Sequence, residues 1–210
     1  MTTQALTCAL LIANHPNAWQ EATVHPFLQQ CQQGTIKAAQ FNTWLVQDYL
    51  FVGEFTRFAA TVLANAPVEH FDTLLGGMGA LKDELLWFQA KAAERSLALN
   101  TAAQATCEEY CEFMRSLTNQ PYAVQATTFW AIELAYNQGW QKHSPMPKPY
   151  TEFADRWGNQ GFTDYVKVLA QQADSALSTA SDSEKQKAQQ AFITVAKLEQ
   201  AFWQMAFTQA

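Results

Sequence analysis

Hydrophobic residues recur along this chain at intervals of three and four, the spacing that collects them on one face of an α-helix. The segments that carry this spacing are rich in Ala, Leu, Gln, Glu and Lys, which are good helix formers. Turn-forming residues separate these segments near residues 14–17, 65–67, 100, 118–121, 143–149 and 178–183. No segment alternates polar and apolar residues convincingly enough to indicate a strand. The pattern predicts an all-α protein, a helical bundle that forms a single domain over residues 1–210.

Two short motifs indicate helix starts, and one glycine run needs an interpretation. Ser181 followed by Glu184 is a capping-box pattern, which predicts the start of the last helix. Pro121 suits the first turn of a helix that Asn119 would cap. The run Gly-Gly-Met-Gly at residues 76–79 lacks both the Gly-Lys-Ser/Thr and the preceding strand of a phosphate-binding loop. We interpret these glycines as close helix packing or as a helix start.

Three of the apolar stripes include a carboxylate. Along three of the expected long helices, one position of the three-and-four stripe is occupied by an acidic residue. These residues are Asp48, Glu133 and Glu199. On the helix around residue 110, the corresponding stripe position is Tyr110. We therefore expect three helices each to direct one carboxylate toward the interior.

Buried carboxylates are unusual, because removing an ionised carboxylate from water costs several kcal/mol. Three of them together would repel one another, so some would keep a proton near neutral pH and could act as a general acid or base. Taken singly, each could equally be structural, as we interpret Glu54, which has Arg57 three residues on as a partner on the solvent side. As a set without a local basic partner, they favour a ring-lined pocket for a flat heteroaromatic ligand.

The composition narrows the class of protein. The 210 residues are 49% hydrophobic, 13% aromatic and only 15% charged, which excludes a disordered chain. A formal net charge of −6 argues against a nucleic-acid partner, which needs a basic face. No apolar run reaches the length of a membrane span, and the first residues lack the basic segment of a signal peptide. We therefore expect a cytoplasmic protein with neither a membrane nor a nucleic acid as its partner.

The cysteines and histidines give no indication of a metal site. The four cysteines form no Cys-x-x-Cys pair and no Cys/His zinc spacing, and Cys107 and Cys111 share one helical face. We interpret them as small apolar residues in a reducing compartment. His15 and His25 each precede a proline, which favours a turn or a helix entry over metal ligation. A two-metal helical bundle needs Glu-x-x-His pairs, which this sequence lacks, so we predict no metal and no cofactor.

An ordered series of short motifs resembles the TenA (thiaminase II-like) family over nearly the whole chain. The residues that carry the resemblance are Trp19, His25-Pro26-Phe27, Gly34-Thr35, Phe41, Gln47-Asp48-Tyr49, Phe55, Tyr110 through Met114, Tyr150, Phe153, Trp157-Gly158, Phe162, Phe192 and Glu199 through Ala206. The resemblance implies the heme-oxygenase-like all-α fold without heme, assembled as a homo-oligomer, a dimer or a tetramer. It also implies thiamin salvage chemistry on a small-molecule pyrimidine substrate.

The resemblance also implies roles for individual residues. Asp48 matches the acid that holds the aminopyrimidine, and Phe51 matches the aromatic residue that stacks on it. Glu199 matches an acid that serves catalysis, and Tyr110 matches an active-site tyrosine. Trp157 falls where many members of the family carry a tyrosine.

One departure from the family pattern lies in the segment Trp-x-Ile-Glu-x-x-Tyr at residues 130–136. Much of the family has a nucleophilic cysteine in this helix, whereas the corresponding position here is Glu133. The chain thus resembles a branch of the family that carries a glutamate in a similar segment. Members of that branch are associated with hydrolysis of amino-HMP (4-amino-5-aminomethyl-2-methylpyrimidine) and of its N-formyl precursor.

The leading hypothesis is a cofactor-free aminopyrimidine hydrolase in thiamin salvage that converts amino-HMP, its N-formyl derivative, or both, to HMP. In this hypothesis Glu133 and Glu199 divide the acid and base roles, and Asp48 hydrogen-bonds the ring nitrogen and the exocyclic amine. The residues expected to orient these groups or to sandwich the ring are Tyr110, Tyr136, Phe51 and Trp157. Two alternatives stay open: a non-catalytic pyrimidine-binding protein, and a metal-dependent oxygenase on the same fold.

Overall fold

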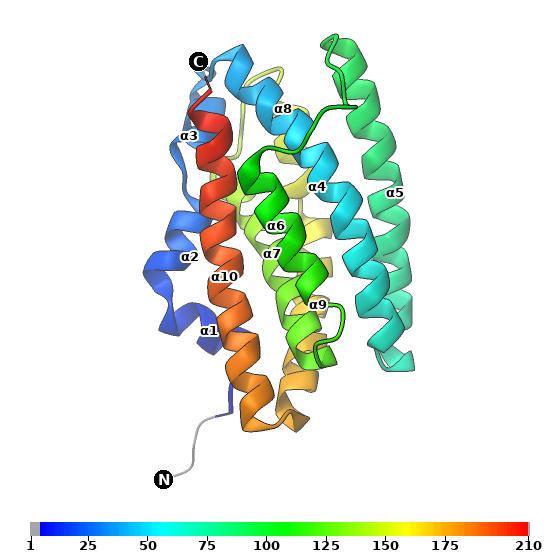
Figure 1. Ribbon diagram of the computed structural model, residues 1–210. Coiled ribbons are helices and arrows are strands. Elements are labelled where there is room, and N and C mark those ends of the chain that lie inside the picture. Colours follow the sequence, from blue (N-terminus) through cyan, green and yellow to red (C-terminus); the bar gives the residue numbers. More distant parts are fainter. Residues whose placement is uncertain (1–4, 210) are drawn as a thin grey trace. The chain divides into compact units, whose positions relative to one another are not determined.

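Every regular element in the described part of the chain is a helix (Figure 1). The computed structural model describes residues 5–209. The elements in chain order are α1 (Cys8–Asn14), α2 (Pro16–Thr23), α3 (Pro26–Gln33), α4 (Ala38–Asn65), the short 3-10 helix η1 (Val68–His70), α5 (Phe71–Glu94), α6 (Ala105–Ser116), α7 (Tyr122–Lys142), α8 (Thr151–Trp157), α9 (Gln160–Thr179) and α10 (Asp182–Phe207). The prediction of an all-α protein is confirmed, and each group of turn residues marked in the sequence coincides with a break between helices.

The chain divides into two compact units. The first comprises Met1–Gly34 and Gln120–Gln200, and it contains α1 to α3, α7 to α9 and most of α10. The second comprises Thr35–Asn119 and Ala201–Ala210, and it contains α4, η1, α5, α6 and the end of α10. That residues 1–210 form a single domain stays a prediction.

Helix α7 is the most deeply buried helix of the first unit. Sixteen of its 21 residues are buried, as expected of a helix that is apolar nearly all round. It packs against α2, α8 and α9. The ring centroid of Phe192 lies 5.0 Å from that of Trp19 and 5.9 Å from that of Trp130 in stacked geometry. This ring stack ties α2, α7 and α10 together.

Helix α4 provides the core of the second unit, where it packs against α5 and α6. The ring of Trp44 lies 6.2 Å from Phe88 of α5 and 6.4 Å from Trp203 near the end of α10, centroid to centroid. The guanidinium of Arg95 lies 4.8 Å from the centre of the Phe41 ring, which adds a cation–π contact at the start of α4. Aromatic packing therefore holds the early part of α4 against two neighbours.

One predicted helix start is confirmed, and the cap predicted for another is wrong by two residues. At the start of α10, Ser181 Oγ accepts from the Glu184 N–H at 3.3 Å, and Glu184 Oε2 accepts from the Ser181 N–H at 2.7 Å, which is the predicted capping box. Pro121, however, is the N-cap residue of α7 and not part of its first turn, because its backbone is extended with ψ of 149°. Asn119 therefore precedes the cap and does not occupy it.

The glycine run lies inside α5, several residues after the helix begins at Phe71. A Cβ atom placed on Gly76 or on Gly79 would meet nothing within 4 Å. Neither glycine therefore marks a close approach of helices or a helix start, and that interpretation of the run is wrong for these two positions.

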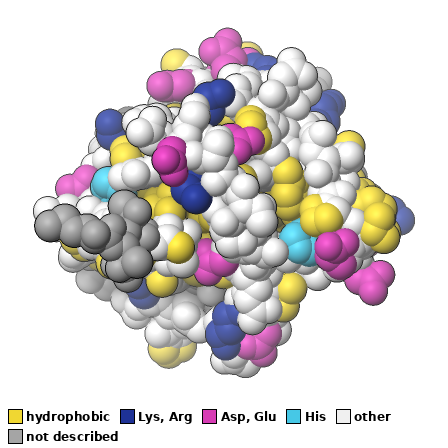
Figure 2. All heavy atoms as spheres, turned by 90° about the horizontal axis from the view of Figure 1, so that it is seen from below, with side chains coloured by type: hydrophobic (Ala, Val, Ile, Leu, Met, Phe, Trp, Pro, Cys, Tyr) yellow, Lys and Arg dark blue, Asp and Glu magenta, His cyan; other side chains and the backbone are white. Residues whose placement is uncertain are grey.

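The surface carries mixed charge on the face shown in Figure 2, where acidic and basic side chains alternate with apolar ones. The most exposed large apolar side chain among the described residues is Val68, in η1. Within residues 5–209, none of the helices combines the length and the apolar character that crossing a membrane would require.

Candidate functional site

The three carboxylates taken from the apolar stripes are all buried. Asp48 is 0% exposed, Glu199 is 1% exposed and Glu133 is 8% exposed. Asp48 lies on α4 in the second unit, whereas Glu133 on α7 and Glu199 on α10 belong to the first. The stripe reasoning therefore identified the positions at which these helices bury an acid.

Phe51 and Tyr110 lie together in the second unit. The ring of Phe51, three residues after Asp48 on α4, lies 4.7 Å from the ring of Tyr110 on α6. It also stacks on Phe55 at 5.8 Å and lies 5.7 Å from Phe202. Phe51 thus belongs to a cluster of four rings, and Tyr110 is almost wholly buried within it.

Gln47, next to Asp48, fixes the approach to α6. Its Oε1 accepts from the Gln104 N–H at 2.7 Å, and its Nε2 donates to the Ala102 carbonyl at 3.4 Å. Its own carbonyl lies 3.5 Å from Cys107 Sγ, which donates to it. The sequence pattern alone gave Gln47 no role. Its position next to a carboxylate on an apolar stripe is the signal that could have indicated a buried amide there.

Cys107 is buried beside Asp48 and Cys111. The hydrogen bond to Cys111, burial and the nearby charge of Asp48 hold the pKa of the Cys107 thiol above its ordinary range. All four cysteines are buried and unbridged, as expected of small apolar residues. A thiol that keeps its proton is a poor nucleophile.

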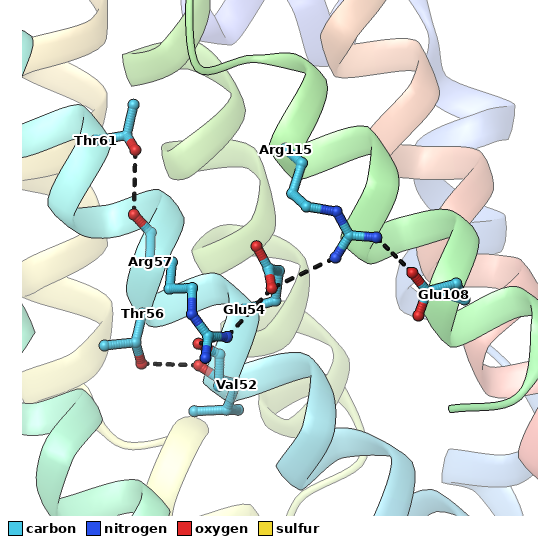
Figure 3. A network of polar contacts seen from close by, with 8 residues as sticks. Val52, Glu54, Thr56, Arg57, Thr61, Glu108 and Arg115 are labelled. Atoms are coloured by element: carbon cyan, nitrogen blue, oxygen red, sulfur yellow. Dashed lines mark hydrogen bonds and ion pairs between the residues drawn. The ribbon is translucent and has the colours of Figure 1, made fainter. Parts of the chain in front are cut away.

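An ion-pair network ties α4 to α6 farther along both helices (Figure 3). Glu54 Oε2 lies 3.2 Å from an Arg57 nitrogen and 3.4 Å from an Arg115 nitrogen, and Arg115 also pairs with Glu108. The predicted partnership of Glu54 with Arg57 is confirmed. Along α4, Asp48 and Phe51 therefore lie between the Gln47 hydrogen bonds and the Glu54 ion pairs.

In the first unit, Glu133 has a hydroxyl partner. Tyr165 on α9 is half-buried, and its Oη donates to Glu133 Oε1 at 3.4 Å. The Tyr165 ring lies 5.9 Å from Phe162, one turn earlier on α9. Sequence reasoning missed Tyr165, because helical periodicity gives no information about which side chain on one helix meets which on another.

Tyr136 and Trp157 also lie together in the first unit. Their ring centroids are 5.6 Å apart with the rings at 81°, and Trp157 stacks on Trp140 at 5.3 Å. Asn137 Nδ2 donates to the Trp157 carbonyl at 2.8 Å and to Thr163 Oγ1 at 3.0 Å. A buried amide of α7 therefore fixes both the end of α8 and the start of α9.

Glu133 and Glu199 each follow a residue of the first unit's ring stack along the same helix. Trp130 of α7 and Phe192 of α10 are in contact, and Glu133 follows Trp130 by three residues while Glu199 follows Phe192 by seven. With a rise of about 1.5 Å per residue, the backbone of each glutamate lies within roughly 11 Å of that ring residue along the helix axis.

Two of the histidines, His25 and His143, bond to the local backbone. His25 caps α3, and its Nδ1 accepts from the Phe27 N–H at 3.1 Å, which confirms its helix-entry role. His143 Nδ1 lies 2.7 Å from the Gly139 carbonyl, and burial lowers the pKa of this imidazole. Across residues 5–209, no three His, Cys, Asp or Glu side chains are grouped so that they could hold a metal ion.

Comparison with known proteins gives consistent matches over nearly the full length. Residues 12–209 match the TENA/THI-4/PQQC family. A soybean (Glycine max) protein named "Probable bifunctional TENA-E protein" is 36% identical over 207 residues, covering 93% of this chain and 90% of that protein. An "Aminopyrimidine aminohydrolase" of Halalkalibacterium halodurans is 27% identical over 206 residues, covering 91% of each chain.

A solved structure also matches this chain over nearly its whole length. A TenA homologue from Pyrococcus furiosus superposes with a TM-score of 0.90 at 30% identity, covering 95% of this chain and 98% of that one. TenA structures have the heme-oxygenase-like all-α fold, and the predicted fold is therefore confirmed.

Proposed function

This chain belongs to the TENA/THI-4/PQQC family, and on that premise we propose that it is an aminopyrimidine hydrolase of thiamin salvage. Its proposed substrates are amino-HMP, the N-formyl derivative of amino-HMP, or both, and the proposed product is HMP. The Halalkalibacterium halodurans relative supports this class of reaction, because it is named an aminopyrimidine aminohydrolase.

The observation that carries the proposal is the burial of Glu133 in α7 with a tyrosine hydroxyl on its carboxylate. A carboxyl group in such surroundings can accept or donate a proton near neutral pH, which is what hydrolysis of a carbon–nitrogen bond requires. The segment around it, Trp-x-Ile-Glu-x-x-Tyr, supports assignment to the branch that carries a glutamate in place of the nucleophilic cysteine.

The proposed reaction on amino-HMP needs one acid and one base. Water attacks the exocyclic methylene carbon while the bond from that carbon to the amine breaks. One of Glu133 and Glu199 accepts a proton from the water, and the other gives a proton to the leaving nitrogen. HMP and ammonia are the products, and no covalent enzyme intermediate forms. Each such proton transfer contributes about two to four orders of magnitude in rate.

On the N-formyl derivative, the same groups would act at a different carbon. Water adds to the formyl carbon, the amide bond breaks, and the nitrogen leaves with a proton from the acid. The products are formate and amino-HMP, which is then hydrolysed as above. One pair of carboxyl groups can serve both steps, because each step needs one proton accepted from water and one given to nitrogen.

Asp48 is proposed to bind the pyrimidine. Its buried carboxylate would hydrogen-bond the protonated ring nitrogen and the exocyclic 4-amine, and charge-assisted bonds of this kind are the stronger ones. A ring held in its protonated form withdraws electrons from the methylene carbon and favours departure of the amine. Phe51 and Trp157 are proposed to sandwich the ring, and Tyr110 and Tyr136 to orient the reacting groups.

The experiment that tests the proposal compares Glu133→Gln with the wild-type protein on amino-HMP. We expect the rate of ammonia release to fall by about two to four orders of magnitude, because the amide can neither accept nor donate the proton. Glu94→Gln is the matched control, because Glu94 is exposed and pairs only with Lys91 among the contacts described for it. A Glu133→Gln protein that released ammonia at the wild-type rate would contradict the assignment.

A further inference from the structure

Tyr165 of the first unit touches the proposed catalytic glutamate and has no role so far. Its hydroxyl donates to Glu133 Oε1 at 3.4 Å across the contact between α9 and α7. We propose that Tyr165 is a positioning residue for Glu133, which holds the carboxylate in the rotamer and orientation that proton transfer needs. This inference rests on the proposed function, because it acts through the proposed acid or base.

The backbone around Tyr165 is held in place independently of that hydroxyl. Two residues before it, Thr163 Oγ1 accepts from Asn137 Nδ2 at 3.0 Å, and Asn137 lies four residues after Glu133 on the same face of α7. Asn159 caps α9 by accepting from the Phe162 N–H at 2.9 Å. These bonds fix the first turns of α9 against α7, so the Tyr165 ring approaches Glu133 from a rigid support.

The charged residues next to Tyr165 on α9 pair with each other. Asp164 and Lys167 are exposed and pair with each other at 2.8 Å. On α7 itself, the residues of Tyr122–Lys142 include no carboxylate besides Glu133. The hydrogen bond between α9 and α7 thus places the Tyr165 hydroxyl on this carboxylate.

The consequence is specific to the chemical step. A hydroxyl that only orients a catalytic carboxylate contributes little to substrate binding, so its removal lowers kcat and leaves KM nearly unchanged. Removal of a hydroxyl that only supports packing would lower stability. Its effect on the rate would be the same whether or not residue 133 can transfer a proton. The two roles therefore separate in kinetics.

The test measures amino-HMP hydrolysis by Tyr165→Phe, by Glu133→Gln and by the double variant. We expect Tyr165→Phe to lower kcat about tenfold and to change KM less than about twofold. The loss is smaller than the full rate contribution of an acid or base, because Glu133 itself is still present. In the Glu133→Gln background, the same change should cost less than about twofold, because residues that act as a unit are not additive. Tyr122→Phe, at the first position of α7, is the matched control and should behave like wild type.

Three outcomes are informative. A selective loss of kcat that disappears in the Glu133→Gln background supports the inference. An unchanged kcat in Tyr165→Phe, or an equal loss in both backgrounds, overturns it while leaving the proposed function standing. A wild-type protein that hydrolyses neither amino-HMP nor its N-formyl derivative overturns the proposed function, and the inference fails with it.

Discussion

At the scale of single residues, buried thiols are a feature with consequences for stability. Cys31 is completely buried on α3, and burial raises the pKa of its thiol above the ordinary 9.0. The folded protein therefore keeps this proton at a pH where the unfolded chain has lost it. Since the unfolded state then binds fewer protons, the free energy of unfolding decreases as the pH rises past 9.

We predict that replacing Cys31 by alanine makes stability less sensitive to alkaline pH. Between pH 8.5 and 10.5 the wild-type protein should lose about 2 kcal/mol more than Cys31→Ala, because one pKa unit corresponds to about 1.4 kcal/mol. Urea unfolding at both pH values measures this difference. Leu28→Ala, also completely buried on α3, is the control, because it lowers stability without removing a titrating group. Equal alkaline losses in the wild type and Cys31→Ala would contradict the prediction.

Periodicity in the sequence identified the buried carboxylates but not their partners. Asp48, Glu133 and Glu199 could be predicted to be buried, because a helix repeats every 3.6 residues and a missing step in a stripe is visible. The bond from Tyr165 to Glu133 joins residues 32 positions apart on different helices. Its formation depends on how α9 packs on α7, which no local pattern records.

At the scale of secondary-structure elements, α4 and α6 are joined at two places. Gln47 bonds to the backbone just before α6, and the Glu54–Arg115 ion pair joins the two helices farther on. Between these points the Phe51 ring meets Tyr110. This ion pair is only partly buried, and ion pairs at the surface contribute only about 0–1 kcal/mol, so we expect the buried Gln47 bonds to be the stronger link.

We predict that Gln47→Leu lowers the free energy of unfolding by about 1–3 kcal/mol, because the Gln104 N–H loses its partner. Urea denaturation measures the change. Gln89→Leu is the matched control, because Gln89 is exposed and bonds to the Tyr49 hydroxyl, and it should cost less than about 0.5 kcal/mol. Equal costs for the two variants would show that the Gln47 bonds do not hold α6.

Helix boundaries were predictable where a cap uses neighbouring residues. The capping box of Ser181 and Glu184 spans four positions, so its residues alone indicate it. The break after α3, which the turn groups did not include, uses Gly34 with a positive φ of 69°. The Pro121 position was not predictable in this way, because proline is compatible with both the cap and the first turn of a helix.

At the scale of the whole molecule, the family match spans residues 12–209 and so includes parts of both compact units. The all-α architecture followed from composition and periodicity, whereas the division into two units did not. Segments distant in the sequence make up each unit, and α10 contributes to both. Such long-range association is set by the packing of large rings, as in the stack of Trp19, Trp130 and Phe192.

The central claim is that this protein hydrolyses an aminopyrimidine, and product identification tests it most directly. Purified protein would be incubated separately with thiamin, amino-HMP and N-formyl-amino-HMP, and the pyrimidines, ammonia and formate measured by mass spectrometry and enzymatic assay. We predict HMP with ammonia from amino-HMP, the same products with formate from the N-formyl derivative, and intact thiamin. Recovery of both aminopyrimidines unchanged, with no HMP formed, would contradict the account.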